Sequence, residues 1–384
     1  MAATTDIAWT DCTFNFLIGC RHATYQDESG KSHGHPGCLN CYAEAFAKRT
    51  GKAQWGEHGT RNKTSAKNWQ EPLKWNLAAE AGICRACNGK GWLKDSEDKT
   101  LLSKCDRCEN TGKIGPHRRK VFCASLGDVF EEWDGEVTDH HGNAHFTSDD
   151  GKLDMVSNAE MAGSDSDGYH YTTMGDMRAA LFNLIDATPS LDWQVLTKRP
   201  QNIVTMWPVK HDNQPIFPGA PGKLGEPVPC IVTGAYRENV WLMTSISDQA
   251  TANALIPHLF KARHLAPVLG VSAEPLMSRI NFNTLTDGEW NYNALTGLRE
   301  NPFTEIVTRQ QGPKLDWVII GGESGGRRRD CGVEAIVDLA GQCKSAGTST
   351  FVKQDCNKSP GQQGRIPDSI WSLKQFPEVS HANA

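Results

Sequence analysis

Two groups of cysteines carry the clearest chemical signal in this sequence. Cys84, Cys87, Cys105 and Cys108 form two CxxC pairs, one on each side of residues 88–104. Paired thiolates at this spacing are typical of one tetrahedral zinc ion, and the neighbouring glycines suit the tight turns that such pairs need. Because four thiolates saturate the ion, we expect a structural zinc. The module would either only staple a hairpin or also offer basic side chains to a phosphate backbone, namely Arg85, Lys90, Arg107 and Lys113.

The second group offers three cysteines, Cys20, Cys38 and Cys41, ahead of a predicted helix. Three thiolates on a 4Fe–4S cluster leave one iron open to a substrate or cofactor, whereas a structural zinc ion needs a fourth ligand. The spacing alone leaves zinc and an iron–sulfur cluster equally open. Three nearby histidines could supply the fourth zinc ligand, namely His22, His33 and His35.

Strands that alternate with helices would position these groups. Helical patterns at residues 173–187 and 333–347 lie between short apolar runs. Buried strands alternating with helices indicate a parallel sheet wound in βα units, so we expect an α/β fold with a partial or full parallel (β/α) barrel. The predicted strands lie within residues 120–130, 192–200, 240–247, 266–276, 315–325 and 349–355.

Polar residues follow every one of these predicted strands. The carboxyl ends of parallel strands meet at one edge, where α/β folds bind their ligands. A single polar residue at a strand end is more often a cap or a surface group, but agreement at six successive strands favours a shared site. The candidates are Ser125, Asp128, Lys198, Arg199, Ser245, Glu274, Gly321, Gly322, Glu323, Ser324, Lys353 and Gln354.

Insertions interrupt the alternating pattern. Residues 84–116 form the cysteine-rich module, and residues 131–172 are rich in Gly, Asp and His, so we expect a surface loop or a mobile lid there. Three histidines in this second insertion could bind a metal, although a solvated loop explains them equally well: His140, His141 and His145. A Pro/Gly-rich loop at residues 215–229 interrupts the barrel further along.

Composition excludes several classes of protein. The 384 residues are 38% hydrophobic and 22% charged, which is ordinary for a globular protein with a real core. We find no membrane span and no secretory signal, and expect a cytoplasmic protein. The net charge is -5, yet residues 84–120 hold ten Lys/Arg against five Asp/Glu. The six remaining cysteines are expected to be scattered buried thiols: Cys12, Cys123, Cys230, Cys331, Cys343 and Cys356.

Several spaced motifs give the sequence a resemblance to a known family. "IAWTDCTFN", "PGCLNCYAEAFAKR", "LTKRPQN", "SAEPL" and "DWVIIGGESGG" with "FVKQ" occur in that order. Together they resemble a bacteriophage-borne, largely uncharacterised family allied to the radical S-adenosylmethionine (SAM) superfamily, which is similar to the DNA photoproduct lyases. The insert motif "CRACNGKGW" looks like the zinc module of J-domain chaperones.

The resemblance implies a division of the chain and a set of cofactors. Residues 1–83 would be the cluster-binding part of a radical SAM barrel, 84–116 a zinc-knuckle insertion and 117–384 the rest of the barrel with a polar loop at about 131–172. Cys20, Cys38 and Cys41 would bind a 4Fe–4S cluster that chelates SAM and cleaves it to a 5'-deoxyadenosyl radical. The protein would bind, orient and exclude water, and would take electrons from a flavodoxin or ferredoxin.

The strand-end residues would then hold SAM. Ser125 and Asp128 would lie near the methionine amino group, and Lys198 and Arg199 would face a carboxylate or phosphate. Ser245 and Glu274 would face the ribose hydroxyls. Gly321 and Gly322 would let backbone approach a ligand, with Glu323 as a polar anchor.

The chain departs from the superfamily pattern in two places. The first gap of its cysteine motif extends over residues 21–37 where the usual motif is CxxxCxxC, and Asn40 stands where an aromatic residue usually precedes the last cysteine. The GGE triplet, which usually follows the second strand, lies near the carboxyl terminus as Gly321, Gly322 and Glu323, so its usual role does not transfer.

The resemblance points to a DNA base as the substrate. We expect phage thymine hypermodification by a radical SAM enzyme of the isomerase or lyase type, in which an amino-acid substituent at the 5-methyl group moves from nitrogen to carbon attachment. Flipped or single-stranded bases stack on aromatic residues, and Trp55, Trp69, Trp75 and Trp92 are candidates, although core packing suits most of them better. The alternatives are a non-catalytic, zinc-stapled nucleic-acid-binding protein and a radical SAM enzyme that acts on a free nucleotide or small molecule.

Overall fold

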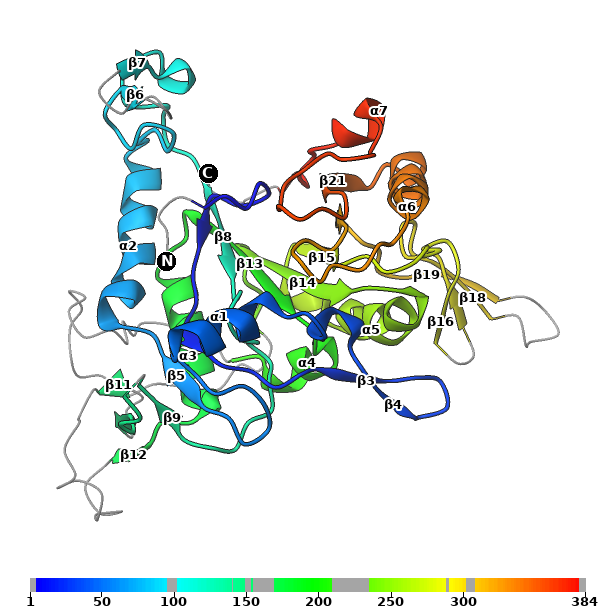
Figure 1. The fold of residues 1–384 in the computed structure, drawn as a ribbon, viewed down its shortest axis with the longest axis horizontal. Coiled ribbons are helices and arrows are strands. Elements are labelled where there is room, and N and C mark those ends of the chain that lie inside the picture. The colour runs from blue at the N-terminus through cyan, green and yellow to red at the C-terminus, as the bar shows by residue number, and fades with distance from the viewer. Residues whose placement is uncertain are drawn as a thin grey trace.

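A sheet of seven parallel strands organises the molecule, described here from a computed structural model (Figure 1). The structure describes residues 5–94, 102–139, 141–148, 153–154, 169–208, 235–287, 290–301 and 308–379. The strands are β1 (Cys12–Thr13), β8 (Arg119–Cys123), β13 (Leu191–Thr197), β14 (Val240–Ile246), β15 (Val268–Ala273), β20 (Trp317–Gly321) and β21 (Ser349–Gln354).

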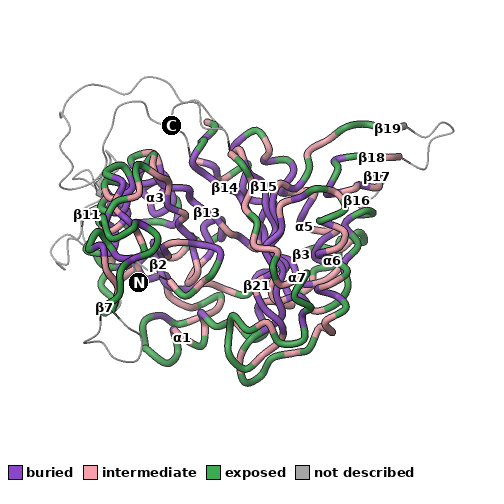
Figure 2. The backbone as a smooth tube through the Cα atoms, turned by 90° about the horizontal axis from the view of Figure 1, so that it is seen from above, coloured by how far each residue is buried: buried purple, intermediate pink, exposed green. Residues whose placement is uncertain are grey.

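The strands lie in the sheet in the same order as in the chain, and every neighbouring pair is parallel. A doubly wound sheet would reverse its order at a switch point, whereas a barrel adds each strand beside the last. From above, the strands follow a curve, with buried residues concentrated along them (Figure 2). The expected α/β partial barrel is therefore confirmed, and all six predicted strands are present.

Helices form most of the crossovers, as the alternating pattern predicted. The capping boxes Thr173/Asp176 and Asp248/Thr251 begin α3 and α5. Between β15 and β20 a four-stranded antiparallel sheet replaces the helix, with β16 (Leu285–Asp287), β17 (Trp290–Tyr292), β18 (Leu298–Asn301) and β19 (Thr308–Gln311). The helices are α1 (Tyr42–Thr50), α2 (Ala66–Glu80), α3 (Met174–Asp186), α4 (Ile203–Met206), α5 (Gln249–Lys261), α6 (Val333–Ala346) and α7 (Asp368–Trp371).

The two faces of the sheet are both buried, but in different ways. On one face, side chains such as Val121, Leu242 and Ile320 join the large core that the helices cover. Because side chains alternate across a strand, their neighbours point to the other face. There Trp9, Phe122, Trp241, Met243, Val268, Trp317, Ile319 and Phe351 form a second cluster. Aromatic rings therefore fill the inner side of the partial barrel.

The segments outside the main sheet form small strands. β2 (Leu17–Ile18), β5 (Arg61–Lys63) and β9 (Val137–Thr138) make one sheet, and β3 (Thr24–Gln26) pairs with β4 (Ser32–Gly34). β6 (Trp92–Lys94) and β7 (Leu102–Lys104) form a hairpin that lies beyond the end of α2, away from the main sheet (Figure 1). A further antiparallel sheet has the strand order β11 (Leu153–Asp154), β10 (Phe146–Ser148) and β12 (Tyr169–Tyr171).

The insertion at residues 131–172, expected to be a surface loop or a lid, contains short strands in its described parts. Its described residues contribute β9 to one small sheet and form β10, β11 and β12. His141 is exposed and His145 is buried, whereas His140 lies outside the described residues. The Pro/Gly-rich stretch 215–229 also lies outside them. In the part of the chain that the structure describes, no helix has the length and apolar character needed to cross a membrane.

Candidate functional site

A cavity of about 590 Å³ opens at the carboxyl ends of the parallel strands. Its floor is apolar, because Ile7, Trp9, Phe122 and Leu196 line it from the aromatic cluster inside the sheet. This volume lies within the range of about 300–1,000 Å³ that is usual for small-molecule sites. Most of the predicted strand-end residues line it, namely Ser125, Asp128, Lys198, Arg199, Ser245, Glu274, Gly322, Glu323, Ser324, Lys353 and Gln354.

All three cysteines of the first group also line this cavity. Cys20 follows β2, Cys38 ends a short 3-10 helix that begins at Pro36, and Cys41 directly precedes α1. The segment between the first two cysteines folds out as the β3–β4 hairpin, and the amide of His35 donates to the carbonyl of Ala23 at 2.8 Å. The hairpin therefore returns the chain to the cavity, which explains how an unusually long gap still brings the cysteines together.

The geometry of these thiols differs from that of a single-ion site. In the described part of the chain, two groups of three or more metal-ligating residues have all their ligand atoms within 4.8 Å of each other inside the group. Neither group contains Cys20, Cys38 or Cys41. A tetrahedral zinc with four bonds of about 2.3 Å would hold its sulfurs about 3.8 Å apart. The three thiols thus face one cavity at a wider spacing than one zinc ion requires.

The nearby histidines are engaged elsewhere. His35 is buried, its Nε2 lies 3.0 Å from the carbonyl oxygen of Ser245, and its Nδ1 accepts from the amide of Gly37 at 3.0 Å. Burial and the neighbouring Lys198 lower the pKa of His35 to about 3, so its ring is neutral and pins the cysteine loop to β14. His33 lies 2.7 Å from Asp27, and His22, at the cavity wall, lies 2.9 Å from Glu44.

Arg199 connects one of these thiols to a buried network of charges. Its guanidinium donates to Cys20 Sγ at 3.6 Å, to Asp128 at 3.0 Å and to the carbonyl of Arg21 at 3.0 Å. Burial and the charges of Glu131 and Asp128 nevertheless raise the pKa of Cys20 above its usual value, and Arg199 opposes this shift by favouring the thiolate. Its role toward a ligand carboxylate stays a prediction, because its described contacts are with the protein itself.

Asp128 is an internal anchor in this structure. It accepts hydrogen bonds from Thr197 Oγ1 at 2.6 Å and from the amides of Lys198 and Phe130. Burial opposes ionisation of this carboxyl, but the charge of Arg199 and these hydrogen bonds hold its pKa below the usual value. The ionised Asp128 therefore fixes the turn after β13, from which Lys198 and Arg199 reach the cavity.

Glu131 is a site-supporting residue that the sequence did not single out. Its side chain is fully buried and pairs with Arg61, which donates to it at 2.7 and 2.9 Å. The same carboxylate accepts from the amide of Arg21, next to Cys20, at 2.8 Å. It lies at the start of a segment that reads as polar loop, and only the fold brings it against β5 and the cysteine loop.

The remaining strand-end residues make contacts within the cavity wall. The Ser125 hydroxyl accepts from Asn15 at 3.0 Å, and the Ser245 hydroxyl donates to the carbonyl of Glu274 at 3.1 Å. Glu323 accepts three hydrogen bonds from Arg329 and one from Asn40, at 3.3 Å, in the cysteine loop. These bonds tie the end of β20 to the loop that carries Cys38 and Cys41.

The two glycines of the GGE triplet serve close packing inside the protein. Glu274 on the β15 side pairs with Lys353 of β21 at 2.9 Å, across β20. A Cβ on Gly321 would come within 2.6 Å of Glu274 Oε1, so glycine leaves room for this ion pair. A Cβ on Gly322 would come within 2.5 Å of the amide of Cys356. Gly322 lines the cavity, whereas Gly321 is not one of its lining residues.

Lys198 contributes a second cation to the cavity, next to Arg199. Among the described residues no hydrogen bond or ion pair is found for its ammonium group, although it lines the cavity beside Arg199. Lysine ammonium groups are favoured ligands for carboxylates and phosphates. That Lys198 faces an anionic group of a ligand stays a prediction.

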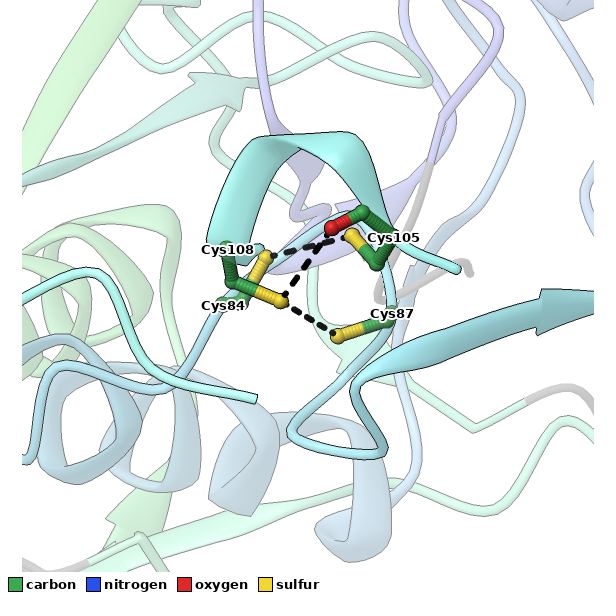
Figure 3. Close-up of side chains that lie close together, drawn as sticks. All are labelled: Cys84, Cys87, Cys105 and Cys108. Atoms are coloured by element: carbon green, nitrogen blue, oxygen red, sulfur yellow. Dashed lines mark hydrogen bonds between the residues drawn. The ribbon is translucent and has the colours of Figure 1, made fainter. Parts of the chain in front are cut away.

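The four knuckle cysteines form a second, separate centre (Figure 3). Their ligand atoms all lie within 4.8 Å of one another, with Cys84 and Cys105 sulfurs 3.8 Å apart and those of Cys87 and Cys108 3.6 Å apart. These distances match the spacing of about 3.8 Å that a tetrahedral zinc imposes. The cluster is buried, and a metal ion such as zinc could bind there.

The two knuckles repeat each other in their backbone geometry. The amides of Gly91 and Gly112 donate to the second sulfur of their own knuckle at 3.1 and 3.3 Å. Both glycines have positive φ, near 79° and 76°, and a Cβ on either would come within 2.3 Å of a backbone oxygen of the other knuckle. The predicted need for glycine in these turns is confirmed.

The basic residues of the module and the candidate tryptophans lie in different surroundings. Arg85 pairs with Asp11, which ties the module to the amino-terminal segment, and the ammonium of Lys90 lies 5.5 Å from the centre of the Trp92 ring. Trp69 and Trp75 are buried in the main core, as was expected of most tryptophans. Trp55 instead lines the cavity beside the cysteines.

The remaining cysteines only partly follow the expectation of buried thiols. Cys12, Cys123 and Cys343 are buried, and Cys230 lies outside the described residues. Cys331 and Cys356 are only half-buried, and their sulfurs lie 3.5 Å apart. These two positions, distant in the sequence, meet because α6 and β21 bring their ends together.

Comparison with known proteins assigns the chain to a family. A family model matches residues 4–147 and 155–369, and its description is "Protein of unknown function (DUF5131)". Neither a curated protein nor a solved structure matches the chain. The match extends from before β1 to α7, so it covers both the cavity and the knuckle module.

Proposed function

Because the chain belongs to this family of proteins of unknown function (DUF5131), its own geometry has to suggest an activity, and we propose that it is a radical SAM enzyme. Cys20, Cys38 and Cys41 would bind a 4Fe–4S cluster, and the cavity beside them would bind SAM. The proposal extends the α/β partial barrel to a barrel of the radical SAM type.

One observation carries this proposal: Cys20, Cys38 and Cys41 line the same cavity as the polar strand ends, and among the described residues they do not belong to a group compact enough to surround a single ion. Three cysteines suit a cluster with one open iron, whereas a structural zinc site is normally closed by four ligands. The wide spacing of the thiols and the engaged state of His33 and His35 both favour the cluster.

The chain provides a suitable electrostatic setting for such a cluster. Arg199 brings a positive charge to Cys20, and α1 begins directly after Cys41 without a side-chain cap. The free amides and the dipole of a helix amino terminus favour negative charge. The apolar floor of Ile7, Trp9 and Phe122 would exclude water from the cavity.

When bound, the cluster supplies the electron that cleaves SAM reductively. The residues of the chain would bind and orient SAM, and Lys198 is the proposed partner of its carboxylate. The pair Glu274 and Lys353 would present a polar wall toward the ribose, together with Ser245. The electron donor would be a flavodoxin or a ferredoxin.

A direct binding measurement tests the role of Lys198. Replacement of Lys198 by alanine should weaken SAM binding about tenfold or more, because it removes a charge-assisted hydrogen bond. Lys67 on α2 is exposed and outside the cavity, so Lys67→Ala provides the matched control. Calorimetry on the anaerobic, cluster-loaded protein would give both dissociation constants. Equal affinities for the two variants would remove Lys198 from the proposed site.

For the substrate we propose a DNA base, in phage thymine hypermodification, where an amino-acid substituent at the 5-methyl group is rearranged. Trp55 at the cavity and Lys90 over Trp92 in the basic module offer stacking surfaces and charge for an extruded base. The support here comes from residue chemistry and from the sequence motifs.

The substrate proposal is tested by product analysis. Reduced protein, SAM and modified phage DNA would be incubated without oxygen, and the DNA would be digested to nucleosides. We expect an altered thymidine with the wild type and none with Cys38→Ala. Formation of methionine and 5'-deoxyadenosine without any altered nucleoside would count against DNA. Activity on a free nucleotide would favour the small-molecule alternative, for which the cavity is also large enough.

The knuckle geometry supports a second candidate from another class, a non-catalytic nucleic-acid-binding protein stapled by zinc. This candidate predicts salt-sensitive DNA binding, no acid-labile sulfide and a colourless preparation. It also predicts zinc at both cysteine groups, so removal of Cys38 should lower the zinc content from about two ions to about one per chain, with no sulfide to lose.

A further inference from the structure

A pair of thiols lies apart from both cysteine groups. Cys331 lies two residues before α6, Cys356 lies two residues after β21, and their sulfur atoms are 3.5 Å apart. A disulfide bond of about 2.05 Å would need the sulfurs to approach by only about 1.5 Å more. Both residues are half-buried, so small reagents can reach them. Neither the cavity nor the knuckle module uses this pair.

The surroundings of Cys356 favour its thiolate. A hydrogen bond from the Cys331 thiol, helped by the backbone of Cys331 and Glu323, lowers the pKa of Cys356 to about 7, against burial and the charge of Asp330. The same hydrogen bond, together with burial, raises the pKa of Cys331. Two thiols in hydrogen-bond contact, one with a lowered and one with a raised pKa, are the arrangement of a reactive cysteine with a resolving partner.

The pair of thiols is packed against the end of β20 and lies beside Asp330. A Cβ on Gly322 would come within 2.5 Å of Cys356 Sγ, so this cysteine packs directly against the end of β20. The carboxylate of Asp330 lies within 4.8 Å of both sulfurs, which makes the trio a geometric candidate for a metal site. However, Arg365 donates to both Asp330 oxygens, at 2.9 and 2.7 Å, and its positive charge opposes a bound cation there.

We propose that Cys331 and Cys356 form a thiol–disulfide exchange site for low-molecular-weight disulfides such as oxidised glutathione. The Cys356 thiolate attacks one sulfur of the disulfide, a mixed disulfide forms, and the first small thiolate leaves. The Cys331 thiol then loses its proton and attacks Cys356 Sγ, and the second small thiolate leaves. Two protein thiols are oxidised to one disulfide, and one disulfide of the reagent is reduced to two thiols.

Peptide mapping tests the two steps separately. The reduced, metal-loaded full chain would be treated with oxidised glutathione, quenched with an alkylating agent and digested. We expect a cross-link between Cys331 and Cys356 in the wild type. Replacing Cys331 by alanine should stop the reaction at the mixed disulfide on Cys356, and replacing Cys356 by alanine should leave Cys331 as a thiol. Cys343, buried within α6, provides the unreactive reference.

The pH dependence of alkylation provides a readout that a purely structural role would not change. In the wild type, the reaction of Cys356 should have its midpoint near pH 7. Cys331→Ser keeps a hydroxyl donor and should preserve this midpoint. Cys331→Ala removes the donor, raises the pKa of Cys356 and should slow alkylation at pH 7 on the order of tenfold.

Three outcomes would overturn the inference. The pair could stay as two thiols in excess oxidised glutathione, or Cys331 could react equally fast when Cys356 is replaced. A bound metal could also shield both thiols until a chelator is added. None of these measurements involves SAM or the cavity, so their failure would leave the proposed enzyme activity untouched.

Discussion

At the scale of single residues, a buried set of charges supports the candidate site. Asp128, Glu131, Arg61 and Arg199 lie almost entirely out of solvent and hold each other through ion pairs. Buried charges are costly unless they are paired, so the loss of one partner leaves the other uncompensated. Because Arg199 and Glu131 also contact Cys20 and Arg21, this network couples the stability of the fold to the shape of the cysteine loop.

Glu131 gives a direct test of that network. Glu131→Gln keeps the size of the side chain but removes its charge, and should lower the free energy of unfolding by about 3 kcal/mol or more. The adjacent Glu132 is exposed and only approaches Arg21 at 3.7 Å, so Glu132→Gln should cost less than about 1 kcal/mol. Urea unfolding of both variants gives the comparison. Equal midpoints would show that the buried pair is dispensable.

Cys38 tests the proposed cluster at the level of one ligand. Cys38→Ala should abolish most iron and acid-labile sulfide while zinc remains at about one per chain, because the knuckles are separate. Cys343→Ala removes a buried thiol outside the cavity and should keep all three elements. Iron, sulfide and zinc would be determined on each protein. Full iron and sulfide in Cys38→Ala would exclude this cysteine as a ligand.

At the scale of elements, the sequence predicts the strands well and their long-range partners poorly. Each apolar run with polar residues at its carboxyl end proved to be a strand of the parallel sheet, because burial on both faces leaves a local signature. The β3–β4 hairpin, the β16–β19 sheet and the contact between Cys331 and Cys356 depend on pairing across the fold. Such pairing has no comparable local pattern, so these features could not be read from the residues.

The residues of the candidate site could be predicted from the local strand pattern, but their long-range partners could not. Residues at strand ends were expected to converge, and most of them line one cavity with the three cysteines. Their partners were not predictable, because Asp128 and Glu323 are engaged by Arg199 and Arg329 through contacts that form only in the folded chain. Lys198 lines the cavity as expected, and its role toward a ligand stays a prediction.

The knuckle module provides the prediction that belongs to this scale. Cys84→Ser should lose the zinc ion and make the β6–β7 hairpin sensitive to proteases, because the module has little core besides its four buried cysteines. Ser103→Ala changes an exposed residue of the same hairpin and should keep both zinc and protection. Zinc analysis and limited proteolysis would be compared. Retention of zinc in Cys84→Ser would contradict a four-thiolate site.

At the scale of the whole molecule, the candidate site lies on one side of the partial barrel, at the carboxyl ends of its parallel strands. The strands keep chain order, the aromatic cluster closes the interior below, and the cysteine loop crosses above the strand ends. The knuckle module lies apart from this site, at the end of α2 (Figure 1). The four-cysteine site of the module and the proposed cluster site at the cavity are therefore separate places in the structure.

Elemental analysis of the protein purified without oxygen tests this account most directly. The account predicts about four iron, about four acid-labile sulfide and about one zinc per chain, with a brown colour. A colourless protein with about two zinc ions and no sulfide would contradict it, because the thiols of Cys20, Cys38 and Cys41 would then hold a closed zinc site.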